Sequence, residues 1–196
     1  MESFSDGVMA VAITLLVLYI TVPPPGPHSL AHDLGHQWPL YAAYATSFIT
    51  IGIIWINHHV MISRLARTDH SILILNLVLL LTVGLLPFAT DLFATYLKRG
   101  HGQHLAAAIY AGAFLAMAIA FFALNCFILL RRAHMLRVDL PEEARRRILA
   151  RTFTGLPPYA IAIAIAPVSQ YATLIICAAL AAFYALPIAS GANQTA

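Results

Sequence analysis

Six long apolar runs, separated by short polar segments, dominate this chain. Soluble domains carry about 25% charged residues, whereas this chain of 196 residues carries 10% and is 61% hydrophobic. A helix needs roughly 20 apolar residues to cross a bilayer core about 30 Å thick. The sequence therefore predicts an all-α integral membrane protein, with residues 1–196 forming a single domain of six transmembrane helices. The predicted spans cover about residues 4–22, 39–62, 72–97, 105–130, 153–167 and 171–187.

The ends of the first and fifth runs carry helix-breaking residues. The first run ends at a proline-rich segment, 23–27, and proline cannot continue a helix because it lacks the amide donor. No basic region precedes this run, so we interpret it as a retained span and not as a signal peptide. The fifth run carries Pro157 and Pro158 near its start and is expected to begin with a kink. Segment 139–151, with acidic residues before basic ones, predicts a short interfacial helix.

Basic residues gather in the loops on one side of the predicted bundle. Nine of the eleven lysines and arginines lie between spans two and three or between spans four and five, while Lys98 and Arg99 lie on the other side. Because lysine and arginine are retained on the cytoplasmic side, both termini are predicted to be cytoplasmic. Topology thus accounts for the basic character of the chain, and no nucleic-acid partner is expected. The nine residues are Arg64, Arg67, Arg131, Arg132, Arg137, Arg145, Arg146, Arg147 and Arg151.

The sequence carries no pattern typical of an enzyme. It has no serine-histidine-aspartate arrangement, paired catalytic carboxylates or phosphate loop, so neither catalysis nor a cofactor is expected. Cys126 and Cys177 stand alone in apolar sequence and are interpreted as buried structural residues. The adjacent His58 and His59 would point about 100° apart on a helix and could not converge on one ion. We therefore expect no metal site.

The first apolar run opens with a distinctive polar motif, Phe4-Ser5-Asp6-Gly7, followed by a threonine and several leucines. This opening resembles the signature of the transmembrane protein 175 potassium-channel family, in which a phenylalanine-serine-aspartate triplet begins the first helix. The second span contains Trp55-Ile56-Asn57-His58-His59, and the third contains Asn76 and Leu86-Pro87-Phe88, which are also similar to the family's pattern. The specific resemblance covers roughly the first 90 residues.

The resemblance implies a function and an assembly. Prokaryotic members of the family have six spans per chain and form tetramers in which the first helices line one central pore, whereas the animal channel carries two such repeats. A single unit therefore resembles the prokaryotic form, which implies a homotetramer in the lipid bilayer of a prokaryotic cell (inner) membrane, with potassium ions as the permeant species. Carried over by the motif, the pore positions are Val11, Thr14, Leu15 and Leu18.

Helical geometry favours the same placement. At 100° per residue, Val11, Leu15, Leu18 and Val22 fall within a stripe about 60° wide, with Thr14 at its edge. A ring of aliphatic side chains can close a pore by dewetting, and a slightly wider ring can favour potassium, which sheds water more readily than sodium. Our hypothesis is a potassium-selective or weakly selective cation channel with a hydrophobic constriction and a layer of threonine hydroxyls.

A second pattern, Thr82-Val83-Gly84, could be taken for part of the filter loop of ordinary potassium channels. It continues into Leu85 and Leu86 instead of a tyrosine-glycine pair, and it lies in a continuous apolar run that leaves no room for a re-entrant turn. We therefore predict that the chain does not have the ordinary pore-loop fold.

Several polar residues lie near the predicted cytoplasmic ends of the first three spans. Buried polar groups in a membrane need partners, so we predict a network linking Asp6 and Ser5 to His58 or His59. The family also places an arginine four residues before the phenylalanine, a position that falls before Met1 here, so either the chain begins earlier or Asp6 finds another partner. The motif and supporting residues are Phe4, Ser5, Asp6, Trp55, Asn57, His58, His59 and Asn76.

A secondary transporter of a small solute or ion is the main alternative, and a purely structural membrane subunit also stays open. Transporters typically have broken helices and charged residues at the membrane midplane. The predicted spans carry no acid or base near their midpoints, and this favours a channel.

Overall fold

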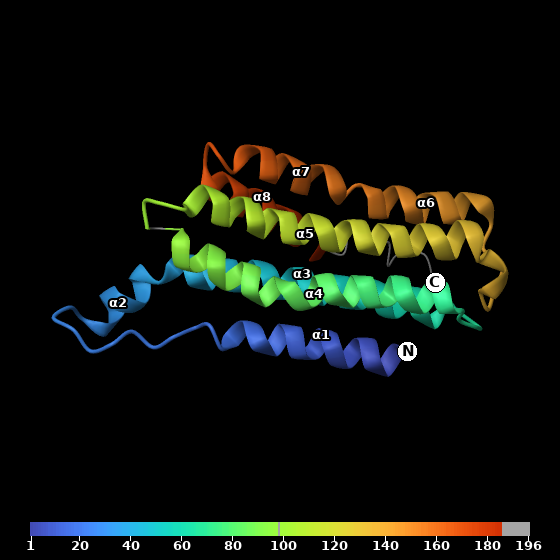
Figure 1. Ribbon diagram of the computed structural model, residues 1–196, viewed down its shortest axis with the longest axis horizontal. Coiled ribbons are helices and arrows are strands. Elements are labelled where there is room, and N and C mark those ends of the chain that lie inside the picture. The colour runs from blue at the N-terminus through green and yellow to red at the C-terminus, as the bar shows by residue number, and fades with distance from the viewer. Residues whose placement is uncertain (98, 186–196) are drawn as a thin grey trace, which may run out of the picture.

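A computed structural model describes residues 1–97 and 99–185, in which every regular element is a helix. Lys98 and the last two residues of the predicted sixth span lie outside this part of the chain. The helices pack side by side along one long axis, with α1 at one edge and α6 and α7 at the opposite edge (Figure 1). The elements are α1 (Glu2–Val17), α2 (Leu30–His36), α3 (Trp38–Ser63), α4 (His70–Tyr96), α5 (Gln103–Cys126), the π-helix η1 (Phe127–Arg131), the 3-10 helix η2 (Ala133–Met135), α6 (Glu142–Phe153), α7 (Leu156–Ile165) and α8 (Gln170–Ala185).

Four helical stretches of the described chain are long and apolar enough to cross a membrane. They are α3, α4, α5 continued by η1, and α6 continued by α7. The helices α1 and α8 have 16 residues each, which at 1.5 Å per residue gives about 24 Å, less than the roughly 30 Å of the hydrocarbon core. The chain is therefore an all-helical membrane protein, and six spans remain a prediction that depends on these two shorter helices.

The first helix ends earlier than the sequence predicts. Instead of reaching residue 22, α1 stops at Val17 and closes with bonds to the third preceding residue, such as Leu18 N to Leu15 O at 3.2 Å and Ile20 N to Val17 O at 3.0 Å. The residue before a proline is disfavoured in the helical region, and Val22 precedes Pro23. Val22 is 86% exposed and lies outside the helix, so it does not belong to the helical stripe.

The predicted fifth span, residues 153–167, corresponds to α7, and α6 precedes it as a nearly collinear helix (Figure 1). The break between α6 and α7 falls at Thr154 and Gly155, and Pro157 lies in the first turn of α7, where its missing amide costs nothing. The expectation of an interfacial helix was wrong, because α6 runs along the bundle beside α5 and not across its end. One reason is aromatic packing, since the rings of Phe153 and Phe122 on α5 meet edge to face at 5.7 Å.

Buried polar and aromatic side chains connect the central helices. The Ser47 hydroxyl on α3 lies 2.8 Å from the Thr90 hydroxyl on α4 and 3.1 Å from the Tyr110 hydroxyl on α5. The Tyr110 ring stacks on Phe93 with centroids 4.6 Å apart and meets Phe114 edge to face at 4.8 Å. Specific contacts thus fix α3, α4 and α5 relative to one another, which gives α1 a rigid surface to pack against.

The segment resembling a filter loop is ordinary helix. Thr82, Val83 and Gly84 lie inside α4, which runs unbroken from His70 to Tyr96. Their carbonyls therefore belong to the helix and do not form a re-entrant turn.

Two interhelical loops join at the end of the bundle where α1 begins (Figure 1). Ala66 N donates to Met135 O at 2.8 Å, and Arg137 N donates to Arg64 O at 2.8 Å. Arg132 Nε lies 2.5 Å from Asp69 Oδ2 in a salt bridge between the same loops. These contacts hold Arg64, Arg132 and Arg137 together at one end of the molecule, and the cytoplasmic location of that end remains a prediction.

Asp69 combines two roles in this loop pair, and a pH titration separates them. Its carboxylate accepts from Ile72 N at 2.8 Å as the N-cap of α4, and it pairs with Arg132. The Ile72 amide and the Arg132 guanidinium hold the pKa of the Asp69 carboxyl below its ordinary value of 3.8. A carboxyl whose pKa is lower in the folded state than in the unfolded state stabilises the fold at pH values above its unfolded-state pKa. This stabilisation is lost as the pH falls through the folded-state pKa.

We expect Asp69→Asn to keep the cap and lose the charge, because asparagine is an equally good N-cap. Its midpoint of thermal unfolding in detergent should be roughly 1–3 °C below that of the unsubstituted protein at pH 7. The difference should close as the pH falls below 3.8. Asp69→Ala, which also removes the cap, should lower the midpoint further. If the difference between Asp69→Asn and the unsubstituted protein were the same at every pH, the charge of Asp69 would not be its source.

Candidate functional site

The first helix has one face packed against the bundle and one face uncovered. Its buried residues, Ser5, Met9, Ala12 and Leu16, are spaced four, three and four residues apart and face α3 and α4. In Figure 1, α1 has neighbouring helices on one side only. The four residues that the sequence assigns to a pore lie on its uncovered side: Val11, Thr14, Leu15 and Leu18.

All four of these side chains are exposed on the single subunit, and three of them are apolar. Val11 is 55% exposed, Leu15 40% and Leu18 70%. Thr14 is also exposed, and its hydroxyl donates to Val11 O at 2.9 Å within the same helix. Since that bond uses the only hydroxyl hydrogen, the oxygen of Thr14 can offer only lone pairs to a partner outside the helix.

A buried chain of hydrogen bonds attaches α1 to α4 and α3. Asn76 Nδ2 donates to Ser5 Oγ at 2.9 Å, and Asn76 Oδ1 lies 2.7 Å from His58 Nε2. Ser5 Oγ in turn donates to Met1 O at 3.2 Å. Ser5 uses its only hydroxyl hydrogen for Met1 O, so it must accept from the Asn76 amide. The Asn76 oxygen therefore faces His58, which must carry a hydrogen on Nε2. Nδ1 of His58 is buried and has no partner among the described residues, which agrees with a neutral ring.

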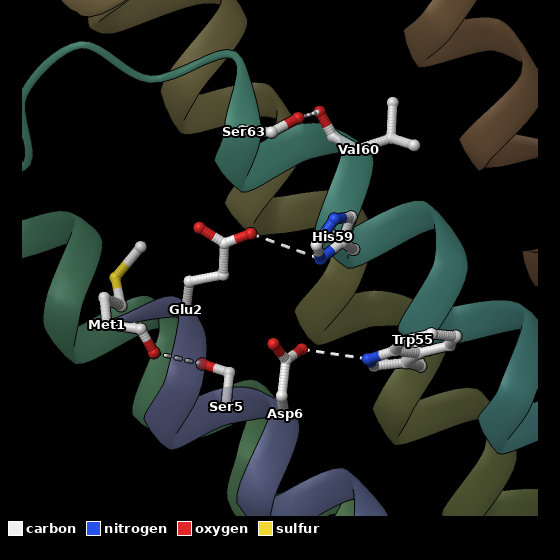
Figure 2. Close-up of polar contacts among 8 residues, drawn as sticks. All are labelled: Met1, Glu2, Ser5, Asp6, Trp55, His59, Val60 and Ser63. Atoms are coloured by element: carbon white, nitrogen blue, oxygen red, sulfur yellow. Dashed lines mark hydrogen bonds and ion pairs between the residues drawn. The ribbon is translucent and has the colours of Figure 1, made fainter.

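Two further contacts join α1 and α3 at a more exposed level (Figure 2). Trp55 Nε1 donates to Asp6 Oδ1 at 2.9 Å, and His59 Nδ1 lies 3.2 Å from Glu2 Oε1. The two contacts are one helical turn apart, because Glu2 and Asp6 are four residues apart on α1 and Trp55 and His59 are four residues apart on α3. The two contacts thus form parallel rungs between the helices, with the His59 and Glu2 side chains about half exposed.

The predicted polar network differs in its pairings from the observed contacts. Ser5 reaches His58, but through Asn76, and Asp6 bonds to Trp55 and to neither histidine. Glu2, which the sequence analysis did not consider, is the partner of His59. Its position four residues before Asp6 was the available signal, since the two residues share one face of α1.

Two residues of the predicted motif take no part in this network. Asn57 donates to Ile53 O of its own helix at 2.8 Å and faces a groove on the far side of α3. Placing it in the network was wrong, because position 57 is two residues from Trp55 and therefore about 200° around the helix from it. Phe4 is 59% exposed, next to the network but on the uncovered side of α1.

Sequence comparison finds close relatives of this chain. A family described as endosomal/lysosomal potassium channel TMEM175 matches residues 1–87. A protein of Streptomyces collinus named as a potassium channel is 45% identical over 186 residues, which cover 93% of this chain and 89% of that protein. The chicken endosomal/lysosomal proton channel TMEM175 is 35% identical over 111 residues, which cover 52% of this chain and 22% of that protein.

Solved structures agree with the sequence comparison. The crystal structure of a lysosomal potassium-selective channel TMEM175 homolog from Chamaesiphon minutus matches this chain with a TM-score of 0.81 at 38% identity, over 94% of both chains. A crystal structure of a variant of the potassium channel MtTMEM175 has the same fold, with a TM-score of 0.62 at 19% identity. Since the Streptomyces relative is matched over nearly its whole length, this chain belongs to the TMEM175 family, a family of ion channels and not of enzymes.

Proposed function

We propose that this chain is one subunit of a potassium-selective or weakly selective cation channel in a prokaryotic cell membrane. Four copies of α1, one from each subunit of a homotetramer, would surround the ion path. The observation that carries the proposal is the uncovered face of α1, where Val11, Leu15 and Leu18 are 40–70% exposed although the opposite face is fully packed. Bacterial relatives named as potassium channels support the choice of ion.

In this arrangement each exposed position of α1 becomes a ring of four side chains. Rings of Val11, Leu15 and Leu18 would form the hydrophobic constriction, which excludes water when narrow and favours the more easily dehydrated ion when wider. The Thr14 ring would provide the polar layer, because its hydroxyl hydrogen is already used by Val11 O. The oxygen then presents lone pairs, which a cation needs in place of lost water.

The polar contacts of α1 would serve to hold the pore helix and not to bind ions. Ser5, Asn76 and His58 are at most 2% exposed and are bonded to one another. Trp55 and His59 add two contacts to the same helix. With the arginine-rich end in the cytoplasm, this attachment would lie at the cytoplasmic end of the pore and the constriction farther outward.

Reconstitution into liposomes tests the proposed class directly. With a potassium gradient across the membrane, a channel should show discrete unitary currents that vary linearly with voltage near the reversal potential. A secondary transporter should instead show slow, saturable flux coupled to a second solute. Replacing potassium by sodium on one side and measuring the reversal potential would give the selectivity. Coupled flux without unitary currents would favour the transporter.

Substitution of Leu18 tests the constriction. Leu18→Ala should raise unitary conductance severalfold and bring the permeability to sodium closer to that to potassium, because a ring of four smaller side chains is wider and wetter. Leu81→Ala on α4 is the matched control, since Leu81 is a similarly exposed leucine at 66%. If Leu18→Ala left both properties unchanged while Leu81→Ala altered them, the assignment of α1 to the pore would be wrong.

Asn76→Ala tests the attachment of α1. The substitution leaves His58 Nε2 without an acceptor in a buried site, which should lower the free energy of unfolding by about 1–3 kcal/mol. Asn57→Ala is the control, because the Asn57 amide bonds only to a carbonyl of its own helix. Thermal unfolding in detergent should show a clearly lower midpoint for Asn76→Ala than for Asn57→Ala. Equal losses would mean that the buried chain does not hold α1.

A further inference from the structure

A long groove lies on the side of α3 that faces away from α1. It has a volume of about 570 Å³ and is bounded by α3 on one side and by α5, α6, α7 and α8 on the other. Most of its wall is apolar and includes Phe48, Ile53, Met117, Phe121 and Leu180. Its lining also includes two arginines, Arg64 just after the end of α3 and Arg151 in the last turn of α6, which together define its mouth. The groove therefore has an apolar body and a positively charged mouth.

Within the part of the chain that the structure describes, the two arginines at the mouth lack the ion pairs that Arg132, Arg146 and Arg147 make. Arg132 pairs with Asp69, and Arg146 and Arg147 pair with glutamates one turn away. Among the described residues, no hydrogen bond or ion pair engages the guanidinium of Arg64 or of Arg151. The described lining of the groove also contains no aspartate or glutamate. Two positive charges thus face one opening without a protein anion to balance them.

The apolar part of the groove is long enough to hold a lipid acyl chain. From Arg64 to Phe48 the groove follows 16 residues of α3, or about 24 Å at 1.5 Å per residue. One leaflet accounts for about half of the roughly 30 Å hydrocarbon core. Gly52 widens the middle of the groove, since a Cβ built at Gly52 would meet no atom within 4 Å. An extended acyl chain can therefore lie along α3 from the mouth.

We propose that this groove binds an anionic phospholipid, with one acyl chain along α3 and the phosphate between Arg64 and Arg151. Arginine matches phosphate oxygens in charge and in its fork of donors, and basic pockets between helices on the cytoplasmic side of a membrane are suited to anionic headgroups. Asn57 and Asn125 also line the groove, and each uses its amide group for a carbonyl of its own helix. Among the described residues, nothing donates to their side-chain oxygens, which can accept hydrogen bonds from the headgroup's hydroxyls.

The charge at the mouth favours this occupant over a protein segment. An apolar helix of a second copy would bury two guanidiniums without an acceptor, and burying unpaired charge is costly. A zwitterionic lipid would bring its own cation close to both arginines. An anionic headgroup satisfies the guanidiniums while its chain covers the apolar wall.

Native mass spectrometry of the full-length protein tests the proposal with defined lipids. The protein in detergent would be titrated with phosphatidylglycerol or with phosphatidylcholine of the same acyl chains, and retained lipid would be counted per subunit. We expect saturable binding of one phosphatidylglycerol per subunit in preference to phosphatidylcholine. Arg64→Gln with Arg151→Gln should weaken phosphatidylglycerol binding by roughly fivefold for each arginine, given the usual attraction of a basic residue for an anionic membrane surface.

Matched controls separate the groove from surface charge. Arg67→Gln with Arg131→Gln removes two arginines from the same end that do not line the groove, and should leave binding unchanged. Gly52→Leu fills the groove without removing charge and should reduce binding of both lipids. Gly84→Leu on α4, where a Cβ also has open space, should not.

Several outcomes would overturn the proposal. Unchanged phosphatidylglycerol binding in the Arg64 and Arg151 double variant would show that these arginines do not bind the headgroup. An equal loss of binding in the Arg67 and Arg131 double variant would show that general surface charge causes the effect. Unchanged binding in Gly52→Leu would place the lipid elsewhere. Absence of saturable phosphatidylglycerol binding would mean that the groove is not a site for an anionic phospholipid. None of these measurements depends on ion conduction, so they stand or fall separately from the channel assignment.

Discussion

The position of α1 depends on the buried hydrogen-bond chain through Ser5, Asn76 and His58. Between helices in lipid there is little hydrophobic driving force, because the lipid tails are as apolar as the side chains. An apolar helix at the edge of a bundle can therefore rotate at small cost unless directional bonds prevent it. Rotating α1 by one residue would turn Ser5 about 100° away from Asn76. The buried hydrogen bonds thus determine which face of α1 is turned away from the subunit.

Much of this arrangement could be predicted from the sequence. Apolar run lengths and the scarcity of charge predicted an all-helical membrane protein, and four stretches of the described chain meet the requirements of a span. The 100° arithmetic placed Val11, Leu15 and Leu18 on one face because residues 11–18 follow nearly regular helical geometry. The motif Phe4-Ser5-Asp6 identified the family, since it combines a short polar triplet with an apolar helix, and composition alone does not do this.

Other features required the fold. Hydropathy cannot locate the end of α1 at Val17, because the largely apolar sequence continues from Leu18 to Val22. The pairings within the network depend on which residues of α3 and α4 lie level with each residue of α1. Asp6 therefore accepts a hydrogen bond from Trp55 and not from a histidine. Asn57 is adjacent to His58 in the sequence, but the helical phase of α3 turns it toward the groove and away from the network. The groove behind α3 joins residues from five helices, and no single run of sequence carries a signal for it.

The attachment of α1 is unequal along its length. Glu2, Ser5 and Asp6 make every side-chain bond that joins α1 to another helix within the described residues. Beyond them, Ala12 and Leu16 are buried by packing alone, and the helix tightens into i to i−3 bonds at Leu18. A small displacement of the helix breaks a directional hydrogen bond and leaves its buried polar groups unpaired. Apolar contacts between helices, in contrast, can be exchanged for contacts with lipid. The free-energy cost of displacing α1 is therefore greatest at its first two turns and falls toward Leu15 and Leu18, the residues assigned to the constriction.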